Sequence, residues 1–198
     1  METRKIWTQF LPQWVLANML GWAIYAPIFV ILFSPIPIHR FPGRGVGIGV
    51  GFLISYFQWL VLKKHMHMDS MWLWTSTLTY SLYLGVLIFI GSNAPNFSTF
   101  TLLMINIVVM SLLSLSQRSA LNYYVNNADI WIVVNAVTSI VAALVVCFGS
   151  QIFSITSPFF VWISYGGIYG VITGITLAKL YLSTLEASRA QSKQAVGQ

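Results

Sequence analysis

The chain has 198 residues, of which 57% are hydrophobic and only 7% are charged. At the usual share of about 25%, a soluble domain of this length would carry roughly 50 charged residues. The ten Lys or Arg and four Asp or Glu present are too few to solvate a compact soluble domain. High hydrophobicity also excludes intrinsic disorder, which requires a polar, strongly charged chain. The composition therefore predicts an integral membrane protein.

Six hydrophobic stretches follow one another along the chain, and a helix needs about 20 such residues to cross a bilayer. The segments between them carry turn residues, such as the three prolines of 34–44. A polar C-terminal tail, 183–198, comes last. We therefore expect one all-α membrane domain over residues 1–198, with transmembrane helices at about 12–33, 45–62, 71–91, 99–117, 130–149 and 158–181.

The basic residues predict the orientation of these helices. Six crossings place both termini on one side, and only Arg40 and Arg44 of the ten basic residues fall on the other. Because basic residues are retained in the cytoplasm, we expect both termini there, in a plasma or thylakoid-type membrane. The basic residues are spread between the hydrophobic stretches, so no nucleic-acid partner is expected. The eight on the cytoplasmic side are Arg4, Lys5, Lys63, Lys64, Arg118, Lys179, Arg189 and Lys193.

A weak internal repeat relates the hydrophobic stretches in pairs. A shift of 59 residues brings the second, fourth and sixth stretches into register, and the first, third and fifth agree at a shift of 58 or 59. The pattern predicts three related helical hairpins and a pseudo-threefold bundle of six helices. The coinciding residues are Ser55, Ser114 and Thr173; Gln58, Gln117 and Thr176; Trp14, Trp72 and Trp131; and Asn18, Ser76 and Asn135.

The repeated polar residues share helix faces, since residues three or four apart lie on one side of a helix. Facing inward, they would form a neutral belt near the cytoplasmic end. Two interpretations stand: the belt joins helices by hydrogen bonds, as polar side chains do in membranes, or it binds a lipid headgroup, a pigment or a small polar solute. The repeated tryptophans are expected to anchor the helices at the membrane interface. The candidate belt residues are Asn18, Ser55, Gln58, Ser76, Ser114, Gln117, Asn135, Thr173 and Thr176.

Reactive and metal-binding patterns are weak in this sequence. His65 and His67 flank Met66 in a loop, but two histidines leave a four-coordinate ion half-ligated, so we expect no metal site. The single cysteine, Cys147, excludes an internal disulfide. No acid–base pair or nucleophile set is recognisable, so we do not expect an enzyme. The glycines spaced by four at 166, 170 and 174 are typical of close helix packing.

Three stretches carry a resemblance to a group of proteins: FQWLVLKKHMHMDSMWLWTS at 57–76, QWVLANMLGWAIY at 13–25 and GGIYGVITGITLAKL at 166–180. They resemble helices of polytopic bacterial membrane proteins, many of them cyanobacterial, in which a Gln-Trp-Leu-Val-Leu run precedes a loop and a tryptophan. The second hairpin departs from this pattern, because Gln117, Arg118 and Ser119 replace Gln-Trp-Leu. The resemblance implies a polytopic membrane fold and no particular activity.

We therefore expect a non-enzymatic integral membrane protein that serves as an accessory or scaffold subunit of a larger membrane complex. Its partners would be the lipid bilayer and other membrane subunits. The alternative is a small permease, facilitator or lipid- or pigment-binding protein that uses the polar belt.

Overall fold

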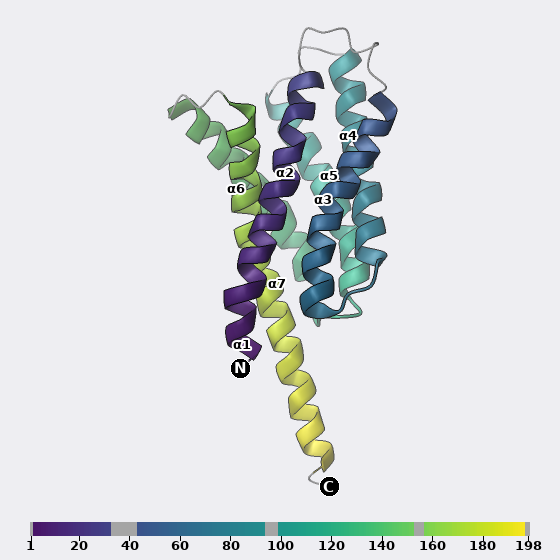
Figure 1. The fold of residues 1–198 in the computed structure, drawn as a ribbon, viewed down its shortest axis with the longest axis vertical. Helices are drawn as coiled ribbons and strands as arrows, with labels where there is room; N and C mark the ends of the chain where they lie inside the picture. The colour runs from purple at the N-terminus through teal and green to yellow at the C-terminus, as the bar shows by residue number, and fades with distance from the viewer. Residues whose placement is uncertain (1, 33–42, 94–98, 153–156, 197–198) are drawn as a thin grey trace.

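The computed structural model describes residues 2–32, 43–93, 99–152 and 157–196 (Figure 1). These residues lie in helices or short connections, and no strand occurs among them. The expected all-α fold is therefore confirmed for the described part of the chain. Its elements are α1 (Glu2–Lys5), the π-helix η1 (Ile6–Phe10), α2 (Leu11–Leu32), α3 (Gly43–Met66), α4 (Met71–Asn93), α5 (Thr99–Leu121), α6 (Ile130–Ile152) and α7 (Pro158–Val196).

The helices from α2 to α7 match the six hydrophobic stretches, but α7 is much longer than its stretch. It continues past residue 181 to Val196, through most of the expected polar tail. Leu182 and Leu185 still pack against the bundle, which favours one further turn. The segment beyond them holds no Gly or Pro before residue 197, so nothing in it stops a helix.

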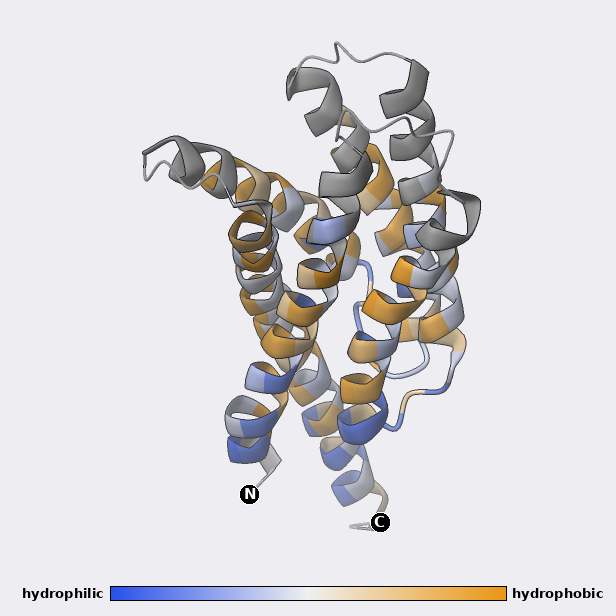
Figure 2. Ribbon diagram, turned by 45° about the horizontal axis from the view of Figure 1, so that its top comes forward, coloured by the Kyte–Doolittle hydropathy of each residue, from blue (hydrophilic) through white to orange (hydrophobic). Residues whose placement is uncertain are grey.

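The helices from α2 to α7 form a closed ring. Each packs against the next in sequence, and α2 also packs against α7. The chain termini lie at the same end of the bundle, which we call the terminal end, and α7 projects beyond it (Figure 1). Hydrophilic residues gather at this end, whereas hydrophobic residues cover the middle of the helices (Figure 2).

Two hydrophobic clusters are stacked along the bundle. The near cluster, at the terminal end, surrounds Trp14, Trp72 and Trp131. The far cluster surrounds Trp22, Tyr80 and Tyr169. On α2, the two clusters are separated by the eight residues from Trp14 to Trp22, which is about 12 Å along a helix.

The outer surface of the bundle is strongly apolar. On α4, Trp74, Leu78 and Leu82 are four residues apart, and Leu78 is 74% exposed. Comparable outward rows occur on the other helices, and each repeats near the helical period. They include Leu16 and Leu20 on α2, Leu53 and Leu60 on α3, Met104, Val108 and Leu112 on α5, and Val133, Val137 and Val141 on α6.

One helical segment among the described residues, Phe159–Ala195, is long and apolar enough to cross a membrane by length and composition. The shorter apolar helical segments are Ile107–Leu121 and Ile130–Val145. Membrane association is thus indicated by one helix, while six crossings stay a prediction. Arg40, which the topology prediction places on the outer side, lies outside the described residues.

Candidate functional site

The expected polar belt lies between the two hydrophobic clusters. On α2, Asn18 comes four residues after Trp14 of the near cluster and four before Trp22 of the far cluster. The same order holds on α4, where Ser76 separates Trp72 from Tyr80. Eight of the nine expected belt residues are at most 1% exposed: Asn18, Ser55, Gln58, Ser76, Ser114, Gln117, Asn135 and Thr173.

Helix α2 is joined to both of its neighbours through the belt. The indole Nε1 of Trp14 donates to the Thr173 hydroxyl of α7 over 3.0 Å. On the other side, Nε2 of Gln58 on α3 donates to Oδ1 of Asn18 over 2.9 Å. Neither bond involves a charged or titratable group, so both bonds position helices and offer no acid or base.

Gln117 on α5 makes two such bonds. Its Nε2 donates to the Ser76 hydroxyl of α4 over 2.9 Å, and its Oε1 accepts from Nε1 of Trp131 on α6 over 3.0 Å. The hydroxyl of Tyr169 on α7 donates to Oδ1 of Asn135 on α6. Within the described residues, five of the six pairs of neighbouring helices therefore share a belt hydrogen bond.

The sixth pair, α3 and α4, differs. Oε1 of Gln58 and Nε1 of Trp72 are both buried and make no hydrogen bond of regular geometry among the described residues, although the Tyr80 hydroxyl of α4 lies close enough to interact with Gln58. The sequence separation from Gln58 to Trp72 is 14 residues, the same as from Gln117 to Trp131. The donor and acceptor that join α6 to α5 thus have counterparts on α4 and α3, and these counterparts do not bond to each other.

Several belt side chains also bond to their own helix. The Thr173 hydroxyl donates to the Tyr169 carbonyl at 2.7 Å, and the Ser55 hydroxyl donates to the Gly51 carbonyl at the same distance. Asn18 and Asn135 each donate to the carbonyl four residues earlier, at 2.9 Å. These bonds fix the side chains and leave few of their polar atoms available to a ligand.

The three repeated tryptophans lie inside the bundle. The expectation that they anchor it at a lipid interface is therefore wrong. Trp14, Trp72 and Trp131 are at most 1% exposed and contact one another edge to face. Their ring centroids are 5.8 to 6.5 Å apart. The indoles share the inward face with the belt residues four positions on, which is why they meet inside the ring.

Thr176 is the belt candidate that the structure places differently. It is only partly buried, and its hydroxyl donates to the Ile172 carbonyl of its own helix. Conversely, Trp14, Trp131 and Tyr169 act in the belt as hydrogen-bond donors, although they were not among its candidates. Their spacing of four residues from Asn18, Asn135 and Thr173 is the signal that could have identified them.

Of the two histidines near the end of α3, His65 packs against the N-terminal helices. His65 Nε2 lies 3.0 Å from Gln13 Oε1, and its ring meets Phe10 edge-on. Burial, together with the charge of Lys64, lowers the pKa of His65 below its ordinary value of 6.5. His67 is exposed, with a φ of 52°. Among the described residues, no three His, Cys, Asp or Glu side chains are grouped to hold an ion.

Comparisons with protein-family models, curated proteins and solved structures find no match to this chain.

Proposed function

We propose that this chain is a six-span integral membrane protein and serves as a structural subunit of a larger membrane complex. The observation that carries the proposal is the distribution of polarity, because a belt of polar side chains is buried between the two hydrophobic clusters while apolar side chains cover the outside. A soluble bundle would bury Leu78 and Trp74 and expose Gln58 and Gln117. Here, Leu78 and Trp74 are 74% and 61% exposed, while both glutamines are 1% exposed.

Energetics supports placing this bundle in lipid. In water, leaving a Leu side chain exposed forfeits about 1.5–3 kcal/mol of hydrophobic stabilisation, and every long helix carries such residues. In a bilayer, the outward apolar rows of the helices contact lipid acyl chains instead of water. Association of the helices then depends on close packing and on hydrogen bonds between them, which are the two features of the interior.

The belt supports a structural role because its polar groups bond to one another between helices and to backbone carbonyls within their own helices. A hydrogen bond between transmembrane helices contributes about 0.6 kcal/mol on average, so five give about 3 kcal/mol. These bonds orient five of the six pairs of neighbouring helices. The equivalent placement of Gln58 and Gln117, and of Asn18 and Ser76, supports the three-hairpin interpretation of the repeat.

The projecting end of α7 supports a role in assembly. Its residues 186–195 are exposed, and the helix reaches beyond the terminal end of the bundle (Figure 1). An exposed polar helix continuous with a membrane-embedded one is suited to contact a partner subunit outside the lipid.

Replacing both belt glutamines tests the structural role. For a structural belt, Gln58→Leu/Gln117→Leu should fold, stay in membranes after alkaline extraction and retain partners identified by mass spectrometry. Gln117→Leu alone should lower stability more than Gln58→Leu, since Gln117 makes two interhelical bonds and Gln58 one. The matched control is Gln9→Leu, at an exposed glutamine outside the belt. Release of the wild-type chain by alkaline extraction would refute the membrane proposal.

A second candidate function is binding of a small polar molecule between α3 and α4. It is favoured by the buried Oε1 of Gln58 and Nε1 of Trp72, which make no hydrogen bond of regular geometry among the described residues and offer one acceptor and one donor. This function predicts that a small molecule co-purifies with the wild type. Its loss from a well-folded Gln58→Leu/Gln117→Leu protein would favour binding over a purely structural belt.

A further inference from the structure

Four exposed basic side chains lie on neighbouring helix ends at the terminal end of the bundle. Arg4 and Lys5 belong to α1, and Lys63 and Lys64 to the last turns of α3. The two segments are held together where His65 meets Phe10 and Gln13, and η1 packs against α3. We name Arg4, Lys5, Lys63 and Lys64 the basic cluster.

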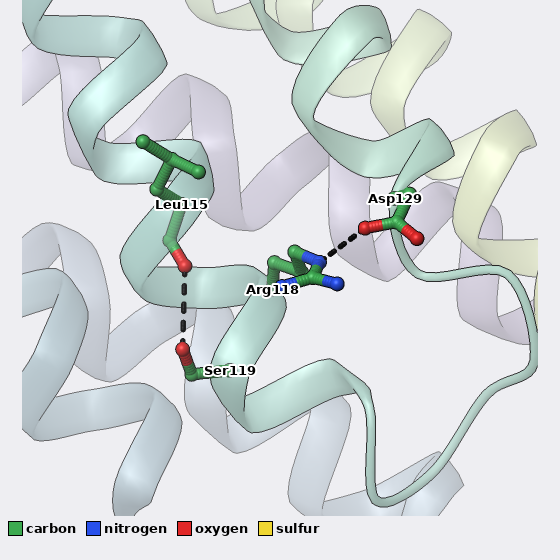
Figure 3. Close-up of polar contacts among 4 residues, drawn as sticks. All are labelled: Leu115, Arg118, Ser119 and Asp129. Atoms are coloured by element: carbon green, nitrogen blue, oxygen red, sulfur yellow. Dashed lines mark hydrogen bonds and ion pairs between the residues drawn. The ribbon is translucent and has the colours of Figure 1, made fainter.

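Two acidic residues near this end, Asp129 and Asp69, are engaged elsewhere. Asp129 forms an ion pair with Arg118 (Figure 3). Oδ1 of Asp69 accepts the backbone N–H of Met71 at 2.9 Å, at the start of α4. Among the described side chains, no ion pair involves a member of the basic cluster. Glu2 is the one acidic residue of α1, so the four basic residues of the cluster leave an excess of positive charge in these two segments.

The basic cluster adjoins the apolar outer surface. On α3, Leu60 faces outward, and Lys64 follows one turn later on the same side of the helix. The Lys63 ammonium lies 4.7 Å from the centroid of the Trp59 ring. A lysine that ends an outward apolar row, beside a tryptophan, matches the residue pattern found at the level of lipid headgroups.

We propose that the basic cluster binds the phosphate groups of anionic lipids in the leaflet that faces the chain termini. The inference rests on the membrane location proposed above. Anionic headgroups complement its charge, and the row from Leu60 to Lys64 places acyl chain and phosphate on consecutive turns of one helix. A soluble acidic partner would use the charges but would leave the adjoining apolar row uncovered. Clusters of four or more basic residues beside a transmembrane helix commonly recognise such lipids.

The test compares two variants that each lose two positive charges. Lys63→Gln/Lys64→Gln removes half of the basic cluster, and Arg189→Gln/Lys193→Gln removes charges from the projecting end of α7. Each protein is reconstituted into phosphatidylcholine vesicles and into equimolar phosphatidylcholine and phosphatidylglycerol vesicles. Lipids retained after mild detergent extraction are then counted by native mass spectrometry. Lys64→Gln alone is the second cluster variant, used if the double variant does not fold.

The expected result is preferential retention of phosphatidylglycerol by the wild type and by the α7 variant. The cluster variant, which lacks two basic residues, should bind it about 25-fold more weakly, given roughly a fivefold effect for each basic residue near a membrane surface. Equal retention of both lipids by the wild type, or equal loss in both variants, would overturn the proposal. Displacement of the lipid by inorganic phosphate would indicate a free-phosphate site instead. Failure to enter either vesicle would refute the membrane location, and the lipid proposal with it.

Discussion

At the scale of single residues, two tryptophans share a similar surrounding but not the same bonding. Trp72 and Trp131 are both fully buried in the near cluster, with ring centroids 5.8 Å apart. Nε1 of Trp131 donates to Gln117, whereas Nε1 of Trp72 has no partner among the described residues. Replacing each tryptophan in turn therefore measures the contribution of the Trp131 hydrogen bond, with Trp72 as the control.

We predict that Trp131→Phe destabilises the bundle by about 1 kcal/mol more than Trp72→Phe. Both changes remove the same ring volume, but only the first strands the buried Oε1 of Gln117, which costs about 1–3 kcal/mol in general. The measurement is the free energy of unfolding, obtained by adding a denaturing detergent to the protein in a mild detergent. Equal losses would show that Trp72 also donates a hydrogen bond, with Gln58 as the candidate acceptor.

The second residue-scale prediction concerns pH. Because the pKa of His65 is lowered in the folded chain, the unfolded chain binds the proton more readily. Stability is therefore fully present above the unfolded value of about 6.5 and declines as the pH falls below it. The unfolding temperature should drop more between about pH 7.5 and pH 5.5 in the wild type than in His65→Gln. A variant with the same pH dependence as the wild type would contradict this role of His65.

The sequence predicted the belt residues better than it predicted their partners. Spacing of three or four residues shows which side chains share a face, and this was sufficient for Asn18, Gln58 and Gln117. It does not show which neighbouring helix they meet. The bond from Trp14 to Thr173 joins residues 159 positions apart and depends on closure of the ring between α2 and α7. The tryptophans were misassigned because an aromatic residue near a helix end suits an interface and a core equally well.

At the scale of elements, α2 and α7 approach closely along a row of glycines. A Cβ atom at Gly166 would lie 2.7 Å from the Asn18 carbonyl oxygen, and one at Gly170 would lie 3.0 Å from Cα of Val15. At Gly167, the nearest atom would be Cγ of Met19 at 3.6 Å, an ordinary contact. Two of the glycines whose spacing predicted close packing, Gly166 and Gly170, thus face the backbone of α2.

We predict that Gly166→Ala destabilises the bundle by about 1–3 kcal/mol, because a fixed backbone atom must move. Gly167→Ala is the matched control on the same helix and should be neutral, or stabilising by up to about 1 kcal/mol through helix propensity. Heat denaturation in detergent distinguishes the two variants. Equal melting temperatures of the two variants would mean that α2 and α7 can move apart without loss of stability.

The end of α7 shows what hydropathy alone leaves out. The apolar stretch ends near residue 181, so hydropathy placed the helix end there. The helix continues because Leu182 and Leu185 contact the near cluster and the Thr184 hydroxyl accepts the backbone N–H of Asn126 over 2.8 Å. The absence of Gly and Pro between residues 181 and 197 permitted this extension, but the contact with the loop before α6 could not be read from the sequence.

We predict that ending the chain after Glu186 leaves the stability of the bundle unchanged and weakens binding of a partner subunit. The removed residues include the exposed part of α7, whereas Leu182, Thr184 and Leu185 are retained. Thermal unfolding and co-purification followed by mass spectrometry measure the two effects separately. Partner binding that survives the truncation would assign assembly to the outer rows of the bundle instead.

At the scale of the whole molecule, the distribution of basic residues between the two ends of the bundle predicts its orientation in the membrane. The terminal end carries Lys63, Lys64, Arg118 and Asp129, close to the two connections at 67–70 and 122–129. Ser157 directly precedes the first turn of α7, and that helix begins at the end opposite the C-terminus. Since basic residues stay in the cytoplasm, the terminal end should face it and Ser157 should face outward.

Single cysteines introduced into a Cys147→Ser background test this orientation. Ser70 and Asn126 are exposed at the terminal end, and Ser157 is exposed at the opposite end, so all three suit labelling. A membrane-impermeant thiol reagent added to intact cells should label Ser157→Cys but not Ser70→Cys or Asn126→Cys. After permeabilisation, all three should react, which controls for accessibility. Labelling of Ser70→Cys from outside would invert the orientation and move the basic cluster to the outer leaflet. Labelling of all three in intact cells would contradict a membrane-spanning ring, because no barrier would then separate the two ends of the bundle.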